Sequence, residues 1–224
     1  MGMHWSGAAT VAGALAECGV YGITTRERRE IATLNEDVLS CSGGACYSPP
    51  TKLSWSPLHK TTRDLILESY NNVPLWYMTE PCTTLLLDGW MDSIPHGELI
   101  CVFTHPFLAA DSLRKANSIS YAEGLEKWVT YNRILKWHIE RNEAVAVIEV
   151  PNNTDKLKTQ LDSLLMELGL TSKYTRSATS DSSQRTLPDL SDIKNAKEAL
   201  SLYQNLKNYP IIPNSQHHQQ QMAS

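Results

Sequence analysis

Several features of secreted, membrane-spanning and metal-binding proteins are missing from this chain of 224 residues. No apolar run reaches the roughly 18 residues that a helix needs to span a bilayer, and no basic-then-apolar leader stands at the start. The five cysteines are scattered, without C-x-x-C spacing. We therefore expect a cytoplasmic protein with reduced thiols, no membrane partner and no metal cofactor.

The chain also lacks a strong charge of either sign. Its formal net charge of −4 offers no general attraction for nucleic acid or for an anionic membrane, so we expect neither as a partner. An apolar content of 42% and a charged content of 20% are ordinary for a globular protein. The length suits one α/β domain, predicted over residues 1–206, and residues 207–224 are predicted to form a disordered tail.

The first nine residues have the spacing of a phosphate-binding loop. Gly2 and Gly7 stand where G-x-x-x-x-G-K-[ST] has its two glycines, and a small-residue helix is predicted directly after them. Ala8 and Ala9 replace the Lys and the Mg²⁺-binding hydroxyl, which excludes a nucleotide hydrolase and disfavours a nucleoside kinase. Turn-forming glycines and a helix N-terminus that attracts an anion remain. The alternative is an ordinary glycine-rich turn before a helix.

Apolar runs and helical patterns alternate along the rest of the chain. This alternation predicts the α/β class, with a parallel sheet flanked by helices on both faces. In a phosphate-loop fold the loop follows the central strand, and here the chain begins at the loop; either that strand lies upstream or the two flanking strands lack a partner between them. Strands are predicted at 75–78, 99–103 and 144–150, and helices at 8–18, 26–39 with Thr25 as cap, 60–70, 84–91, 106–116, 121–141, 154–168 and 189–206.

A series of motifs in the same order resembles bacterial sulfotransferase-like proteins, whose loop reads G-M-H-R-S-G-T-S. Residues 2–7 read G-M-H-W-S-G, residues 26–36 follow the W-E-N-R-E-I-x-x-L-N-[DE] segment, and residues 43–50 follow G-G-S-W-x-x-P-P. Thr79-Glu80-Pro81-Cys82 stands at a K-D-P-R block, Thr104-His105-Pro106 at R-H-P, and Trp128 with Asn132 at W-x-x-x-N.

The resemblance implies a phosphate-loop three-layer sandwich, whose N-terminal strand would either lie upstream of the given sequence or be absent. It implies transfer of a sulfuryl group from 3′-phosphoadenosine 5′-phosphosulfate to a hydroxyl of a carbohydrate or small molecule. Glu27, the acid of W-E-N, would be the catalytic base; the alternative is an acid favoured by a helix N-terminus. Cofactor binding would fall to His4, Trp5, Ser6, Gly7, Ala8, Ala9 and Ser112.

Departures from the family pattern fall on the residues that would bind the cofactor. Trp5 replaces a cation, Ala8 a hydroxyl, Thr79 and Cys82 two basic residues, and Thr104 the arginine expected on the 3′-phosphate. Losing one preorganised donor costs about 3–4 kcal/mol of transition-state stabilisation, so we expect weak or lost activity. The alternative is a non-catalytic binding module that uses the former nucleotide cleft, with Trp5, Tyr47 and Trp76 lining it. His4 and His105 are expected at the carboxyl ends of strands, His105 alternatively as a helix-start residue.

Overall fold

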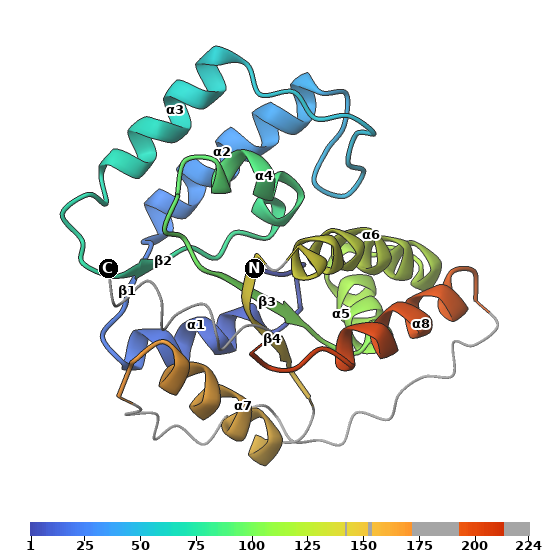
Figure 1. The fold of residues 1–224 in the computed structure, drawn as a ribbon. Helices are drawn as coiled ribbons and strands as arrows, with labels where there is room; N and C mark the ends of the chain where they lie inside the picture. Colours follow the sequence, from blue (N-terminus) through green and yellow to red (C-terminus); the bar gives the residue numbers. More distant parts are fainter. Residues whose placement is uncertain (142, 152–153, 172–192, 213–224) are drawn as a thin grey trace. The chain divides into compact units, whose positions relative to one another are not determined.

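The computed structural model describes residues 1–141, 143–151, 154–171 and 193–212 (Figure 1). These residues form an α/β fold with eight α-helices, as the alternating pattern predicted. The elements are α1 (Ala8–Glu17), β1 (Tyr21–Gly22), α2 (Thr25–Cys41), α3 (Pro57–Glu68), β2 (Trp76–Tyr77), the 3₁₀-helix η1 (Pro81–Leu86), α4 (Leu87–Met91), β3 (Leu99–Phe103), α5 (Pro106–Asn117), α6 (Tyr121–Glu140), β4 (Ala144–Glu149), α7 (Thr154–Glu167) and α8 (Ala196–Lys207).

The strands form two parallel pairs where one sheet was predicted. In the described residues β1 pairs with β2, and β3 pairs with β4. The chain correspondingly divides into two compact units, one containing Gly19–Gly97 and the other containing Gly2–Cys18 and the chain from Glu98 onward. Strand β1 was not predicted because its two residues lie between Gly19 and the cap of α2, in a short segment whose glycines favour a turn.

Helices cover both faces of the β3–β4 pair, as predicted. Val102, Ala146 and Ile148 on one face form a buried cluster with residues of α1 and α7. Alternate side chains point to opposite faces of a strand, and Phe103 accordingly packs against Tyr203 of α8, with ring centroids 6.0 Å apart. Helix α6 packs against both α5 and α8 on this second side; the three helices lie together in Figure 1. Helices of this unit therefore pack against both sides of the strand pair.

One expectation was that the two strands flanking the loop would have no partner between them. Strands β3 and β4 instead pair directly with each other. The two strands bond to each other over their whole length, from the Leu99–Ala144 pair to the Phe103–Glu149 pair. In β4, the Val147 N–H also donates to the carbonyl of Ile211 at 2.8 Å, beyond the predicted domain end at 206. Residues 213–224 of the predicted tail lie outside the described residues, as does the segment from 172 to 192.

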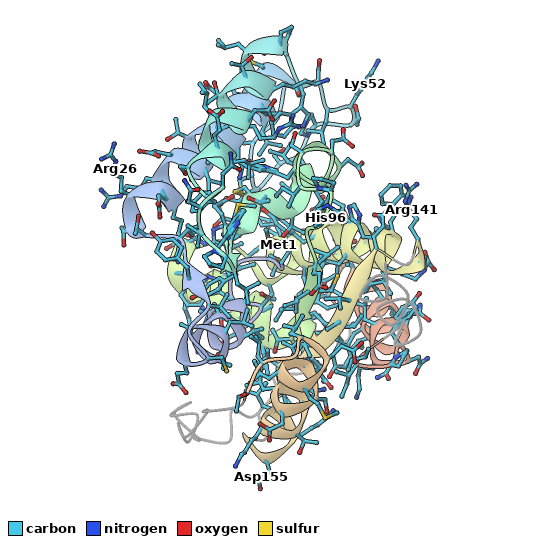
Figure 2. The ribbon with its side chains drawn as sticks, turned by 60° about the vertical axis from the view of Figure 1, so that its left-hand side comes forward. Met1, Arg26, Lys52, His96, Arg141 and Asp155 are labelled. Carbon is cyan, nitrogen blue, oxygen red and sulfur yellow. A yellow bond between two sulfur atoms is a disulfide. The ribbon has the colours of Figure 1, made fainter. Side chains whose placement is uncertain are left out.

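The other unit is built around the long helix α2. A capping box begins it: the Thr24 hydroxyl accepts from the N–H of Glu27, and the Glu27 carboxylate accepts from the N–H of Thr24. The cap is thus Thr24, one residue before the predicted Thr25. In the first turn Arg26 points outward (Figure 2) and pairs with Glu30 at 3.0 Å.

A buried polar network ties α2 to η1 and α4. The Asn35 amide donates to the Glu80 carboxylate at 2.5 Å and to the Thr83 hydroxyl at 2.8 Å, and accepts from the Trp90 indole at 2.9 Å. Glu80 also accepts from the backbone N–H of Cys82 and of Thr83 at the start of η1. Four donors therefore satisfy a carboxylate that is only 5% exposed.

A disulfide joins Cys46 to Cys82 in the same unit, with their Cα atoms 5.4 Å apart. The expectation of reduced thiols is therefore wrong for these two cysteines, and the predicted cytoplasmic location loses that support. Sequence spacing did not reveal the pair because the residues are 36 positions apart and the fold brings the loop after α2 onto η1. Cys18, Cys41 and Cys101 are free thiols. Among the described residues, no helix is both long and apolar enough to cross a membrane.

Candidate functional site

The glycine loop lies against the carboxyl ends of β3 and β4. A Cβ on Gly2 would stand 2.3 Å from the carbonyl oxygen of Val102 in β3. A Cβ on Gly7 would stand 2.6 Å from the side chain of Val150, directly after β4. Only glycine allows so close an approach at both positions. This edge of a parallel sheet is where α/β proteins bind their ligands.

The loop turns sharply into α1 at Gly7. Its φ of 89° is left-handed, and Trp5 also has a positive φ of 65°. The turn is closed by bonds from the Ser6 N–H to the Met3 carbonyl at 3.1 Å and from the Ala8 N–H to the Ser6 hydroxyl at 3.3 Å. No acidic side chain lies in the first turn of α1. The helix therefore presents its partial positive charge at the sheet edge without a carboxylate of its own to neutralise it.

The predicted cofactor-binding residues of the loop differ in exposure. Ser6 is 4% exposed and holds the turn, whereas Trp5 is 55% exposed and available to a ligand. Ala8 packs against the core of the unit, Ala9 is exposed, and His4 is half-buried. Ser112 lies halfway along α5 and is half-buried. The loop residues thus share one edge, but they bring no cation to it.

Thr104, at the predicted arginine position, is part of the framework of this edge. Its side-chain hydroxyl donates to the carbonyl of Val150 at 3.0 Å, and its own carbonyl accepts from the Trp128 indole at 3.1 Å. The residue is only 8% exposed. Thr104 therefore extends the pairing of β3 with β4 and does not offer a side chain to a phosphate group.

Glu27, the predicted base, belongs to the other unit and is engaged there. Its carboxylate closes the capping box of α2 by accepting the Thr24 N–H at 2.6 Å, and it accepts the Tyr21 hydroxyl at 3.4 Å. Partial burial raises the pKa of the Glu27 carboxyl, but the hydrogen bonds from Thr24 and Tyr21 outweigh burial and bring the pKa below its ordinary value. A lowered pKa makes a carboxylate a weaker base at neutral pH.

A cluster of ionisable residues lies at the same edge as the loop; of its members only His105 was considered in the sequence analysis, and Glu149, Lys156 and Tyr203 were not. Glu149 ends β4 and is 8% exposed; it accepts from the Lys156 ammonium at 2.7 Å and from the Tyr203 hydroxyl. His105 caps α5, its ring accepting the Phe107 N–H, and packs edge-on against Tyr203. The available signal in the sequence was a charged residue, Glu149, at the end of an apolar run.

The pKa values in this cluster are shifted by burial and by pairing. Burial raises the pKa of Glu149, but the bonds from Lys156 and Tyr203 outweigh it, so the net shift is downward and the carboxylate stays ionised. Burial, followed by the bond to Glu149, raises the pKa of Tyr203, which is a donor at neutral pH. Burial lowers the pKa of His105 and favours its neutral form.

Comparison with protein-family models, with curated proteins and with solved structures finds no match for this chain. Among the described residues, no group of three or more His, Cys, Asp and Glu side chains is arranged to hold a metal ion. The loop and the ionisable cluster beside it are therefore the candidate site of this chain.

Proposed function

We propose that the unit containing the loop is a phosphate-loop-type domain that binds the phosphate end of a 3′-phosphoadenosine nucleotide weakly. We further propose that it descends from sulfotransferases acting on a hydroxyl of a carbohydrate or small molecule, and that its transfer activity is weak or lost. The observation that carries the proposal is the close approach of Gly2 to β3 and of Gly7 to Val150, with left-handed Gly7 immediately before α1.

The fit of 3′-phosphoadenosine 5′-phosphosulfate to these residues is partial. The backbone of the loop suits a phosphate group, because an anion at the start of α1 would meet N–H donors and the positive helix end. The expected 3′-phosphate position does not fit, since the Thr104 hydroxyl is bonded to Val150 and the residue is buried. We therefore derive no catalytic step from this cofactor.

The contacts of Glu27 favour the non-catalytic alternative. A base must be free to take a proton from the acceptor hydroxyl, and Glu27 instead receives the Thr24 N–H and has a lowered pKa. Trp5, at 55% exposure, offers an aromatic face on which a base or sugar ring stacks. A module that still binds its ligand but no longer transfers a sulfuryl group accounts for both the contacts of Glu27 and the exposure of Trp5.

Calorimetric titration with 3′-phosphoadenosine 5′-phosphate tests the binding step, with adenosine as the phosphate-free control. We expect a Kd weaker than about 1 μM, or −8 kcal/mol, because backbone donors act without a cation. Absence of heat at millimolar nucleotide would refute the proposal. A Kd tighter than about 1 μM would show that the site uses charges beyond the loop.

Restoring a cation to the loop is a second test. Trp5→Arg places the charge on an exposed side chain, so the fold should tolerate it. A charge-assisted bond of about 1.5–3 kcal/mol should tighten the binding of inorganic sulfate, which has no ring to stack on Trp5, by about tenfold or more. Met166→Arg is the matched control: it adds the same charge at a residue that is 77% exposed near the far end of α7. Equal gains in both variants would attribute the effect to net charge alone.

A further inference from the structure

The disulfide joins two cysteines whose surroundings differ sharply. Cys82 lies in η1 and is 6% exposed, and its backbone N–H donates to the buried carboxylate of Glu80 at 3.2 Å. Cys46 is half-buried, and its neighbours Ala45 and Tyr47 are both exposed. One sulfur therefore belongs to a packed helix and the other to a surface turn.

The turn belongs to a loop, residues 42–54, whose two ends are fixed. At its base the Ser42 hydroxyl accepts from the Ser54 N–H at 3.0 Å. The next residue, Trp55, packs edge-on against Trp90 of α4, with ring centroids 6.1 Å apart. Compact surface loops with their ends held together in this way are often functional segments of a protein.

Three backbone hydrogen bonds shape the middle of this loop. The Ala45 N–H donates to the Ser48 carbonyl at 2.9 Å, the Ser48 N–H donates to the Ala45 carbonyl at 3.0 Å, and the Gly44 N–H donates to the carbonyl of Leu39 in α2 at 2.9 Å. None of these three bonds reaches η1, whereas the disulfide does. Exposed loops with few buried contacts open at little cost in free energy, so the disulfide is what holds this loop against η1.

We propose that the bond between Cys46 and Cys82 is a redox-sensitive latch on loop 42–54, which a dithiol reductant opens by attack at Cys46. A thiolate of the reductant attacks Sγ of Cys46, the sulfur–sulfur bond breaks, and Cys82 leaves as a thiolate that takes up a proton. The second thiol of the reductant then displaces Cys46, so the reductant becomes a disulfide and the protein gains two thiols. Attack at Cys82 is disfavoured because η1 buries it.

The first experiment maps where glutathione, a monothiol, attaches to the native chain. The attacked cysteine keeps the glutathione and the leaving cysteine becomes a free thiol, so peptide mapping after an acid quench identifies each. We expect glutathione on Cys46 at least about tenfold more often than on Cys82, because attack requires access to the sulfur. Equal attachment at both cysteines, attachment mainly at Cys82, or no attachment would overturn the proposal.

Two controls accompany this map. In the chain unfolded in urea, burial no longer protects Cys82, so the two cysteines should react alike. The map is repeated in Cys41→Ala, which removes an exposed free thiol five residues before Cys46 that could exchange with the adduct. The preference for Cys46 should be the same in this variant, and its loss there would overturn direct attack at Cys46.

Hydrogen exchange distinguishes a latch from a disulfide that only keeps the unit folded. The hydrogen-bonded N–H groups of Gly44, Ala45 and Ser48 report on the loop, and amides in the middle of α2 report on the unit. After reduction with dithiothreitol the loop amides should lose their protection, whereas the α2 amides should stay protected, although less than in the oxidised protein. Complete loss of protection in both segments, or unchanged protection of the loop, would overturn the latch.

Discussion

Removing the disulfide between Cys46 and Cys82 is the perturbation with the best-defined expected effect. The bond joins the loop after α2 to η1 across a sequence separation of 36 residues. The double variant Cys46→Ala/Cys82→Ala removes both sulfurs and places no new polar group at Cys82, which is 6% exposed. The side-chain hydrogen bonds that link Asn35 to Glu80 and to Trp90 involve neither sulfur. The unit should therefore still fold, with lower stability.

The magnitude follows from the loop that the bond closes. For this separation, the chain-entropy expression predicts a loss of about 4 kcal/mol in the free energy of unfolding at 25 °C. A domain of ordinary stability has about 5–15 kcal/mol in total, so the loss is a large share for a unit of this size. At 1.4 kcal/mol per factor of ten, about 4 kcal/mol corresponds to nearly three orders of magnitude in the unfolding equilibrium.

Hydrogen exchange of the α2 and α4 amides measures this loss within the unit itself. Protection should fall by nearly three orders of magnitude in the double variant. Cys41→Ala, which removes an exposed free thiol, should leave protection unchanged. Thiol titration of denatured, never-reduced protein should find three reactive groups. Five reactive thiols, or a double variant as protected as the wild type, would refute the reasoning.

Three further predictions concern single residues. Gly7→Ala should lower the free energy of unfolding by about 2–4 kcal/mol, because it adds left-handed strain and a clash with Val150. Gly19 also has a positive φ, of 88°, but has open space around it. In the same denaturation assay, Gly19→Ala should therefore lower the free energy of unfolding only by the cost of the strain. Glu27→Gln should cost less than about 1 kcal/mol, since glutamine also closes a capping box, and a fall in sulfuryl transfer of roughly 100-fold would instead establish Glu27 as a base. Burial lowers the pKa of His105, so the unfolded chain binds more protons than the folded one, and stability rises with pH between the folded-state and unfolded-state pKa values of this residue. When the free energy of unfolding is measured against pH, His105→Asn should flatten this rise. An unchanged rise would exclude His105 as its source.

Elements with one dominant local signal were predicted closely. β3 was expected at 99–103 and forms there, because an uninterrupted apolar run between polar turns has few alternatives to a buried strand. The start of α2 was placed one residue late, although the spacing from Thr24 to Glu27 matches the capping-box pattern. The helix expected at 84–91 divides into η1 and α4 because Pro81 and the buried Glu80 cap fix an earlier start.

The candidate site was less predictable because its members meet only in the folded chain. The loop was visible as a local pattern, but Glu149 and Tyr203 are 54 residues apart, and nothing in the sequence marks them as partners. The same holds for Cys46 and Cys82. Thr104 was assigned by position in a motif, whereas the structure gives its hydroxyl to Val150. Spacing predicts local turns well, and long-range pairs follow from tertiary packing.

The pairing of Glu149 with Lys156 leads to a pH dependence of stability. With Glu149 ionised, its carboxylate accepts from the Lys156 ammonium at 2.7 Å. Pairing lowers the pKa of Glu149, so its stabilising contribution is complete above the unfolded-state pKa and is lost as pH falls through the folded-state pKa. Protonation in that acidic range would leave the Lys156 charge uncompensated. The free energy of unfolding should therefore fall as pH drops through that range, and it should fall less steeply in Lys156→Gln. A slope of stability against pH that is the same in Lys156→Gln as in the wild type would contradict this coupling.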